Sequence, residues 1–240
     1  MCSTQTGSPV TAYLGDAAYE YDEHRFATPQ GRLFADLELQ QLRQATRRLD
    51  AGCRVLEVGC GTARFSGYLA KQGFSVVATD PSPDMIEVAS RKCWNLDTIT
   101  FRQEEGARLS FGDSTFAFVF SIRVTNQTDS QEYALRMIGE MIRVAKPGGR
   151  ILVEFVNRER PFARPSKAIR LSFDQIARMA SERNCSVVSR AGVLVFSQSV
   201  LNRIPSALVP VWGALERMAA KVFWRRASRG YILLVKGMDA

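Results

Sequence analysis

The residues of this chain that are best suited to chemistry lie in one short turn. Gly59 and Gly61 follow an apolar, β-branched run at residues 54–58 and precede a helical pattern. Glycine has no Cβ and tolerates positive φ, and the start of the following helix offers unpaired N–H groups. In an open α/β sheet such a turn lies at the carboxyl edge of the strands, where ligands bind. We therefore expect a ligand site here, although a plain tight turn also fits a lone Gly-x-Gly.

An acidic residue at the end of the next expected strand restricts the class of ligand that this turn is expected to bind. Asp80 follows the turn by about 20 residues, the spacing at which an acid reaches a ribose in nucleotide-binding folds. A carboxylate has two acceptor oxygens and can bind both ribose hydroxyls. The turn and the acid together predict that the ligand contains a nucleoside.

Two side chains argue against a dinucleotide. Arg64 stands where a dinucleotide fingerprint has its third glycine, and a long side chain there opposes close packing of helix on strand. Glu57 precedes the turn, and its negative charge would repel a pyrophosphate. The same charge suits an ammonium or sulfonium group. A nicotinamide oxidoreductase is therefore a remote alternative.

The surrounding segments indicate how these residues are positioned. Short apolar runs alternate with helical patterns, which is typical of right-handed β-α-β units and a parallel, doubly wound sheet. Ser82-Pro83 and Ser172 predict helix starts. Strands are expected at residues 54–58, 75–79, 99–101, 116–121, 150–155, 187–188, 193–196 and 231–235. Helices are expected at residues 31–49, 65–70, 83–89, 132–145 and 172–180, with a proline-interrupted amphipathic helix at 208–223.

Residues 57–63 read Glu-x-Gly-x-Gly-x-Ala, and further characteristic stretches lie at residues 78–85, 109–116 and 143–149. In order and spacing these stretches resemble the class I S-adenosylmethionine-dependent methyltransferases, with Ala63 in place of the third glycine of their motif. The resemblance covers about residues 50–156. It is greatest to the small-molecule enzymes of the ubiquinone/menaquinone-biosynthesis type.

The resemblance implies an α/β fold, a doubly wound, seven-stranded Rossmann-like sheet in the order 3-2-1-4-5-7-6. The last strand of this sheet, at residues 231–235, would be antiparallel. An N-terminal segment and a late helical segment would cap the domain. We expect residues 1–240 to form a single methyltransferase domain. Within it, residues 1–30 would be a lid, 50–156 the cofactor-binding half and 157–240 the substrate-side half.

The resemblance also implies roles for individual residues, with S-adenosyl-L-methionine as the cofactor. Glu57 and the backbone of the turn would hold the methionine part, and Asp80 the ribose. Ser121, at the end of the fourth strand, would border the sulfonium. The full set of expected cofactor-binding residues is Tyr21, Glu57, Gly59, Cys60, Gly61, Asp80, Pro81, Glu105, Gly106 and Ser121. Among these, Pro81, Glu105 and the Gly106 N–H would face the adenine.

Methyl transfer from a sulfonium is an in-line displacement that depends mainly on alignment and exclusion of water. A general base is needed only where the nucleophile must lose its proton early. His24 and Tyr21 are the catalytic candidates, and a surface histidine and a packing tyrosine are the plain alternatives. Arg123 and Asn126 follow the fourth strand and are expected to contact the acceptor substrate.

Composition excludes several other classes. The single histidine rules out zinc sites that need two or three imidazoles, so we expect no metal. The five cysteines are scattered and contain no C-x-x-C pair, and no secretory signal is visible. We therefore expect a soluble, cytoplasmic protein without a transmembrane segment. Its oligomeric state is not readable from the sequence.

The formal net charge of +8 permits an acidic partner. Basic clusters at residues 158–170 and 221–229 are compatible with an acidic substrate or peripheral membrane contact, but solvated faces are the default interpretation. Similarly, the apolar stripe from Leu208 to Phe223 is more often a helix packed on a sheet, or a substrate lid, than a membrane-lying helix.

These observations predict a methyltransferase that acts on an O, N or C nucleophile of a small-molecule metabolite. A nucleic-acid methyltransferase ranks below it, because the chain lacks interleaved aromatic and basic residues. The other alternative is a fold relative that binds the cofactor without transferring methyl.

Overall fold

The computed structural model describes residues 27–161, 167–196 and 198–238. Its strands are β1 (Arg54–Val58), β2 (Ser75–Asp80), β3 (Ile99–Gln103), β4 (Phe116–Ser121), β5 (Ala145–Asn157), β6 (Arg170–Leu171), β7 (Cys185–Val193) and β8 (Arg229–Lys236). Its α-helices are α3 (Pro29–Thr46), α4 (Arg64–Lys71), α5 (Pro83–Lys92), α6 (Gln131–Val144), α7 (Phe173–Ser181), α8 (Gln198–Leu201) and α9 (Val209–Phe223). Short 3-10 turns are η2 (Thr125–Gln127), η3 (Ser206–Leu208) and η4 (Trp224–Arg226).

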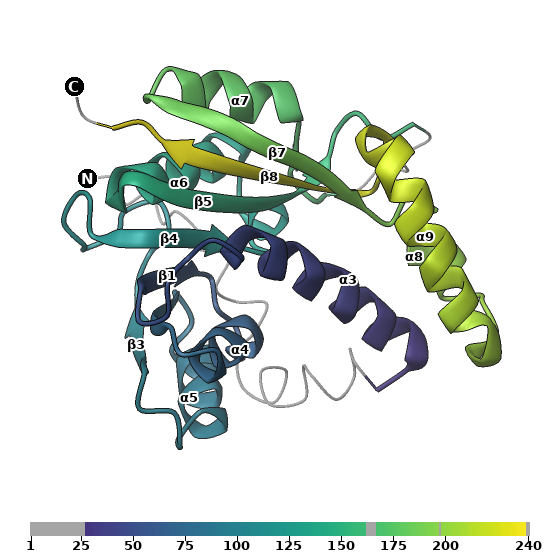
Figure 1. Cartoon of the computed structure of the whole chain (residues 1–240), viewed down its shortest axis with the longest axis horizontal. Coiled ribbons are helices and arrows are strands. Elements are labelled where there is room, and N and C mark those ends of the chain that lie inside the picture. Colours follow the sequence, from purple (N-terminus) through teal and green to yellow (C-terminus); the bar gives the residue numbers. More distant parts are fainter. Residues whose placement is uncertain (1–26, 162–166, 197, 239–240) are drawn as a thin grey trace, which may run out of the picture.

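The strands of the described residues form one sheet in the order β3-β2-β1-β4-β5-β8-β7 (Figure 1). Strands β1 to β5 pair in parallel, whereas β8 is antiparallel to both β5 and β7. When β7 and β8 are counted as the sixth and seventh strands, this is the predicted order with the predicted antiparallel last strand. The two-residue strand β6, which pairs with the end of β5, was not expected.

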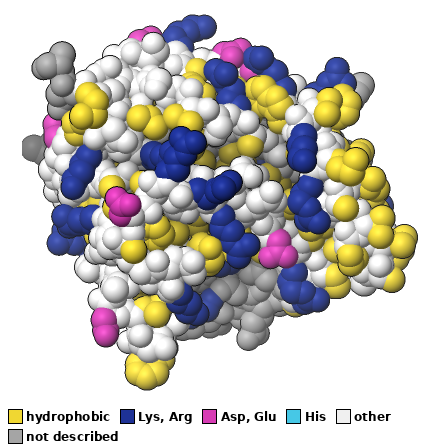
Figure 2. Space-filling model, in the orientation of Figure 1, with side chains coloured by type: hydrophobic (Ala, Val, Ile, Leu, Met, Phe, Trp, Pro, Cys, Tyr) yellow, Lys and Arg dark blue, Asp and Glu magenta, His cyan; other side chains and the backbone are white. Residues whose placement is uncertain are grey.

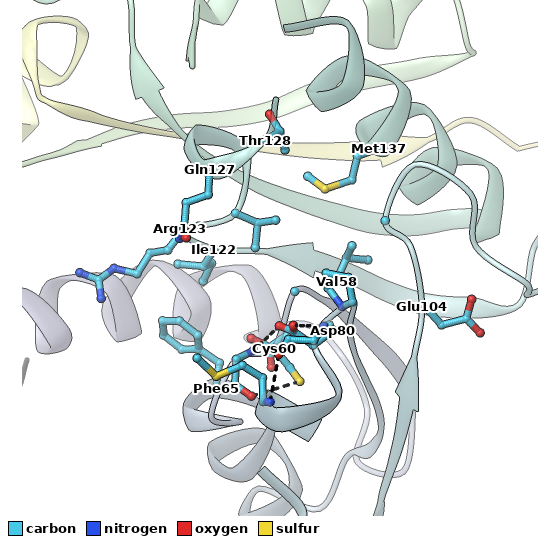
Figure 3. A pocket seen from close by; sticks show the side chains of 18 of the residues that line it. Val58, Cys60, Phe65, Asp80, Glu104, Ile122, Arg123, Gln127, Thr128 and Met137 are labelled. Atoms are coloured by element: carbon cyan, nitrogen blue, oxygen red, sulfur yellow. Dashed lines mark hydrogen bonds between the residues drawn. The ribbon is translucent and has the colours of Figure 1, made fainter. Parts of the chain in front are cut away.

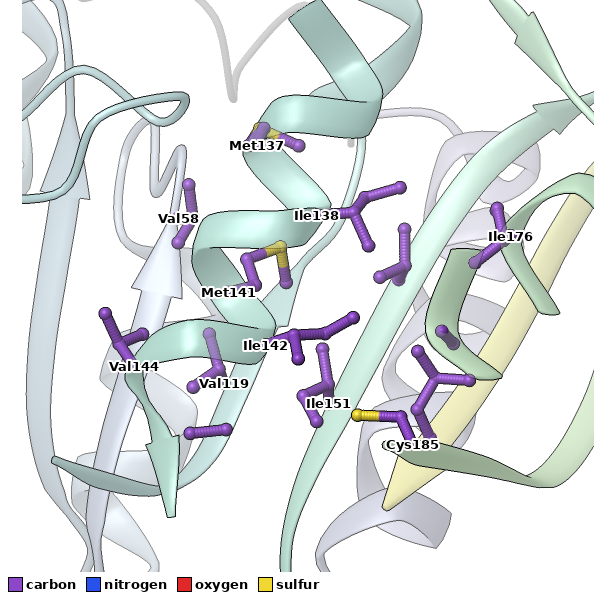
Figure 4. Packing of buried hydrophobic residues seen from close by; sticks show 14 of the residues in the cluster. Val58, Val119, Met137, Ile138, Met141, Ile142, Val144, Ile151, Ile176 and Cys185 are labelled. Carbon is purple, nitrogen blue, oxygen red and sulfur yellow. The ribbon is translucent and has the colours of Figure 1, made fainter. Parts of the chain in front are cut away.

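The central strands are buried on both faces. On one face, α6 packs Met137, Ile138 and Met141 against β1, β4 and β5, where Val58 is one of the contacted side chains (Figure 4). On the other face, Val55 belongs to a cluster that includes residues of α3 and α4. Alternate residues of a strand point to opposite faces, so the nearly continuous apolar runs are explained by helices on both sides.

Helix starts are fixed locally by side-chain caps. The Ser82 hydroxyl accepts a hydrogen bond from the N–H of Met85 (3.3 Å), and Ser172 caps α7 through the N–H of Gln175 (3.1 Å). Both caps were predicted. Each serine satisfies one of the backbone donors that a helix start leaves without an intrahelical partner. The cap at Ser82 matters for function because it fixes the chain directly after Asp80.

Several element boundaries differ from the sequence-based expectation. Strand β5 begins at Ala145, which pairs with Phe116, and the register shifts before Arg150 pairs with Phe118. The Lys-Pro-Gly-Gly turn expected to precede the strand therefore forms an irregularity within it. The separate strand-like runs at 187–188 and 193–196 prove to be one strand, β7, that ends at Val193, and α3 ends at Thr46.

The late helical segment predicted before the last strand is confirmed as α8 and α9, which lie between β7 and β8. Helix α9 packs against α3 and β7 at one end of the sheet (Figure 1). None of the described helices is long and apolar enough to cross a bilayer. The lid expected at residues 1–30 falls mostly outside the described residues, and the division into halves stays a prediction.

Candidate functional site

The glycine turn between β1 and α4 is the floor of the site. Gly59 and Gly61 have φ angles of 77° and 52°, and the N–H groups of Gly59 and Cys60 both donate to the carbonyl of Thr79 (2.8 Å each). A Cβ on Gly59 would lie 2.3 Å from Cγ2 of Val124. Glycine is therefore required at position 59 both for its conformation and for the close approach of Val124.

Ala63 occupies the third position of the glycine motif and has a positive φ angle, as Gly59 and Gly61 do. Ala63 has φ 60° and ψ 30°, and α4 begins at the next residue without a side-chain cap. Position 63 therefore has a left-handed backbone conformation although alanine carries a methyl group.

Asp80 closes the turn from the neighbouring strand. Its Oδ2 accepts a hydrogen bond from the N–H of Gly61 (2.9 Å), and its Oδ1 accepts one from the N–H of Ser82 (3.0 Å). Burial raises the pKa of Asp80 above its ordinary value, and the two N–H groups oppose this shift. Each carboxylate oxygen has a second acceptor position. Asp80 can therefore fix the turn and still bind ligand hydroxyls.

Glu57 is almost fully buried on the wall of the same cavity. It accepts a hydrogen bond from the hydroxyl of Ser66 on α4. Burial raises the pKa of Glu57 to about 8, while the bond from Ser66 and the charge of Arg64 oppose the shift. A positive group beside Glu57 would favour its ionised form. This position is thus suited to a cationic part of a ligand.

The cavity above the turn brings most of the expected cofactor residues together. Glu57, Gly59, Cys60, Gly61, Asp80, Pro81 and Gly106 all line it. Its remaining wall is largely apolar and is formed by Phe65, Met85, Ile122, Val124 and Met137, with Gln127 and Thr128 at one side (Figure 3). The site therefore combines a polar floor with an apolar wall from α4, α5, α6 and the loop after β4.

Glu105 is not among the residues that line this cavity. Its side chain is exposed and accepts a hydrogen bond from the Tyr133 hydroxyl, whereas the preceding residue, Glu104, lines the cavity. Glu105 pairs with Arg108 in an isolated bridge, and the Glu104 carboxylate accepts hydrogen bonds from Ser110. The assignment of Glu105 to the adenine stays a prediction. Gly106 lies close to Met137, since an added Cβ would be 3.1 Å from it.

Ser121 also lies outside the lining of the cavity. Its buried hydroxyl donates to the carbonyl of Val58 (2.8 Å) and so joins the ends of β4 and β1. The next two residues, Ile122 and Arg123, are the ones that line the cavity. Ser121 therefore joins two strand ends beside the cavity, and its expected contact with a sulfonium stays a prediction.

Of the two residues expected to contact the acceptor, only Arg123 lines the cavity. Asn126 instead accepts a hydrogen bond from Arg229 of β8 (3.2 Å) through its Oδ1. The 3-10 turn η2 directs consecutive side chains to different sides, so that Gln127 faces the cavity and Asn126 does not. Tyr21 and His24, the catalytic candidates, lie outside the described residues.

The role of Glu38 was not predicted from the sequence. This fully buried carboxylate on α3 pairs with Arg64 at the start of α4 (2.5 Å) and with Arg123 after β4 (2.6 Å). Both arginines line the cavity, on different elements. The one available signal was an acidic residue on the apolar side of the predicted helix, next to Leu37. Glu38 therefore fixes α3 to both sides of the site.

Comparisons with known proteins agree with this geometry. A family model described as a methyltransferase domain matches residues 55–149. The chain is 33% identical over 156 residues to a demethylmenaquinone methyltransferase of Clavibacter sepedonicus, an alignment that covers 62% of each chain. It is 32% identical over 108 residues to a ubiquinone biosynthesis O-methyltransferase of Rhizobium etli, covering 45% of this chain and 42% of the relative. The chain thus spans less than two thirds of these relatives.

Solved structures share the fold at low sequence identity. A magnesium protoporphyrin IX methyltransferase from Synechocystis, with bound SAH, matches with a TM-score of 0.59 at 18% identity, covering 87% of this chain and 83% of that one. The [4+2]-cyclase SpnF matches with a TM-score of 0.62 at 17% identity, covering 83% and 81%.

The fold and the domain match agree with the predicted class, the class I S-adenosylmethionine-dependent methyltransferases. The match to a methyltransferase domain covers residues 55–149, and the Synechocystis neighbour with the same fold was solved with SAH bound. The relatives cited above are proteins that this chain resembles over part of its length.

The close approach at Gly59 generates a stability prediction. Gly59→Ala forces a non-glycine residue to φ 77° and brings its Cβ against Val124, so we expect the free energy of unfolding to fall by about 2–4 kcal/mol. Val124→Ala removes the clash but not the strain, and the double variant should be more stable than Gly59→Ala alone. Urea denaturation of the three variants measures their free energies of unfolding. A double variant less stable than Gly59→Ala would contradict the packing described.

The burial of Glu57 generates a pH prediction. Its folded pKa of about 8 lies above the ordinary value of 4.5, so the folded chain holds a proton that the unfolded chain loses between these values. This contribution to stability is complete below the unfolded pKa and is lost as pH rises through the folded pKa. Glu57→Gln should therefore flatten the fall in unfolding free energy between about pH 5 and pH 8. Parallel pH profiles for the two proteins would contradict the shift.

Proposed function

We propose that this chain transfers the methyl group of S-adenosylmethionine to an oxygen, nitrogen or carbon nucleophile of a small-molecule metabolite. The observation that supports this most strongly is the placement of Glu57 and Asp80 on either side of one glycine turn, at the ends of neighbouring strands in the same cavity. This set offers a negative charge for an ammonium or sulfonium and acceptors for ribose hydroxyls.

The residues present fit the cofactor. Gly59 and Gly61 leave room at the turn that side chains would fill or strain, and we assign the methionine part to them and to Glu57. We assign the ribose to Asp80. The base would lie near Pro81 and Gly106, with Glu104 or Glu105 as the acidic neighbour.

Bound S-adenosylmethionine supplies an electrophilic methyl group, whose in-line displacement leaves a neutral thioether. The residues of this chain then have to align the acceptor with the methyl group and to exclude water. Phe65, Ile122, Val124 and Met137 offer an apolar wall to the acceptor, and Gln127 and Thr128 offer it a few polar contacts. Such positioning is worth roughly 7–11 kcal/mol of the barrier in well-oriented systems. His24 and Tyr21 stay the proposed catalytic residues.

The acceptor that this wall suits is an apolar, ring-containing molecule. Relatives named for demethylmenaquinone methylation and for ubiquinone biosynthesis support an acceptor of this general kind. We further propose a cytoplasmic location, which is supported by four free cysteines among the described residues.

A second candidate function is favoured by one comparison. The [4+2]-cyclase has the same fold, so the fold is compatible with a reaction other than methyl transfer. Incubation with cofactor labelled in its methyl group and with candidate quinol acceptors separates the two. Labelled product is expected from methyl transfer, and product that never carries label would favour the second candidate.

The proposed role of Asp80 predicts a loss of cofactor affinity. Asp80→Asn removes the charge but keeps the shape, and charge-assisted hydrogen bonds contribute ~1.5–3 kcal/mol each. We therefore expect S-adenosylhomocysteine to bind about 10- to 100-fold more weakly in calorimetry. Asp97→Asn, a change of the same kind at an exposed residue outside the cavity, is the matched control. Equal affinities for all three proteins would refute the assignment.

A further inference from the structure

The outer face of α9 carries an exposed apolar stripe, which the sequence led us to expect packed on a sheet or in a substrate lid. Its side chains recur at intervals of three and four residues, so they share one side of the helix. Their exposed fractions are far above those of core residues, and Figure 2 shows apolar side chains gathered at the end of the molecule where α9 lies. The stripe consists of Leu208 (53% exposed), Val211 (61%), Leu215 (47%), Met218 (66%) and Val222 (71%).

The orientation of α9 is fixed by its opposite side. Val209, Gly213 and Glu216 are buried there, about half a helical turn away from the stripe. The Glu216 carboxylate accepts hydrogen bonds from the N–H groups of Val195 (2.6 Å) and Phe196 (3.4 Å). Rotating the stripe inward would break these bonds and turn Val209 and Glu216 to solvent. The expectation of a helix that packs this stripe on the sheet is therefore wrong.

The charges around the stripe have one sign. Glu216 is the only acidic residue between positions 198 and 228, and it is 2% exposed. Every exposed ionisable side chain in this segment is basic: Arg203, Arg217, Lys221, Arg225 and Arg226. Arg225 pairs with Glu159 and Asp174 of other elements. The segment around α9 thus combines an exposed apolar stripe with exposed side chains of basic character only.

We propose that this α9 surface, defined by the stripe and by Arg217 and Lys221, docks on an anionic lipid membrane. An amphipathic helix that lies in a membrane interface buries its apolar side at the boundary of the acyl chains, and its basic side chains interact with anionic headgroups. Both features are present here on one rigidly held helix.

The alternative occupant with the same apolar pattern is a second copy of this chain. Two α9 helices paired through their stripes would bring Lys221 of both copies beside the interface. Helix pairs of this kind are stabilised by opposite charges at those positions, and this segment has no exposed acid to supply them. The charges therefore favour the lipid surface.

The α9 surface is mechanically connected to the cavity. A Cβ on Gly213 would lie 2.8 Å from a methyl group of Leu33, so α9 packs closely on α3. The next residue of α3, Phe34, lies under the guanidinium of Arg123 (4.6 Å), which lines the cavity. Docking would therefore hold the wall of the cavity near the membrane, although the docking itself does not depend on the proposed methyl transfer.

Sedimentation of the full chain with lipid vesicles tests the proposal. We expect binding to vesicles of phosphatidylcholine mixed with phosphatidylglycerol, weaker binding to pure phosphatidylcholine, and a loss of affinity as salt rises. The triple variant Val211→Ser/Leu215→Ser/Met218→Ser and the double variant Arg217→Glu/Lys221→Glu should each bind the mixed vesicles at least about tenfold more weakly. These side chains are exposed, so the variants should keep the melting temperature of the wild type.

Matched controls change the same kinds of residue elsewhere. Trp94→Ser/Val188→Ser/Met238→Ser removes three exposed apolar side chains outside α9, and Arg47→Glu/Arg48→Glu makes the same change in net charge. Both should bind vesicles as the wild type does. All variants should also bind S-adenosylhomocysteine equally, which separates this test from that of the proposed function.

Two results would overturn the proposal. One is a wild-type chain that does not bind the mixed vesicles, or that binds them no better than the α9 variants do. The other is a dimer in analytical ultracentrifugation that the triple serine variant abolishes, without vesicle binding by the wild type. The second result would assign the stripe to another copy of this chain.

Discussion

The structure depends on a glycine turn that two buried or half-buried carboxylates flank. Asp80 fixes the turn by accepting the Gly61 N–H, and Glu57 lies beneath it with its pKa raised to about 8 by burial. The mutual repulsion of Asp80 and Glu57 adds to that shift. This concentration of acceptors is costly in an empty cavity and becomes favourable when a ligand brings positive charge and hydroxyl groups. The arrangement therefore favours one kind of ligand over neutral or anionic ones.

The buried carboxylate of Glu38 positions the walls around that turn. Glu38 joins α3 to Arg64 and Arg123, which line the cavity from different elements. Through Leu33 and Phe34, α3 also connects the cavity with α9, whose apolar side faces solvent. The late helical segment is therefore part of the same mechanical unit as the site.

Features set by local sequence could be predicted, and features set by distant contacts could not. The glycine turn, Asp80 and the cap at Ser82 follow from backbone conformation and strand-helix alternation, and together with the family resemblance they led to the correct strand order. Glu104 and Glu105 differ only through a bridge at Arg108, and Glu38 is fixed by arginines 26 and 85 residues away. The periodicity of α9 identified its stripe but not whether the stripe faces the core or solvent.

The central claim is that Glu57 and Asp80 receive the positive and the ribose ends of one cofactor. A crystal structure with S-adenosylhomocysteine bound tests it most directly. We expect the amino group of the methionine part beside the carboxylate of Glu57, and the ribose hydroxyls within hydrogen-bond distance of Asp80. A ligand seated elsewhere, or bound with the ribose away from Asp80, would contradict the account.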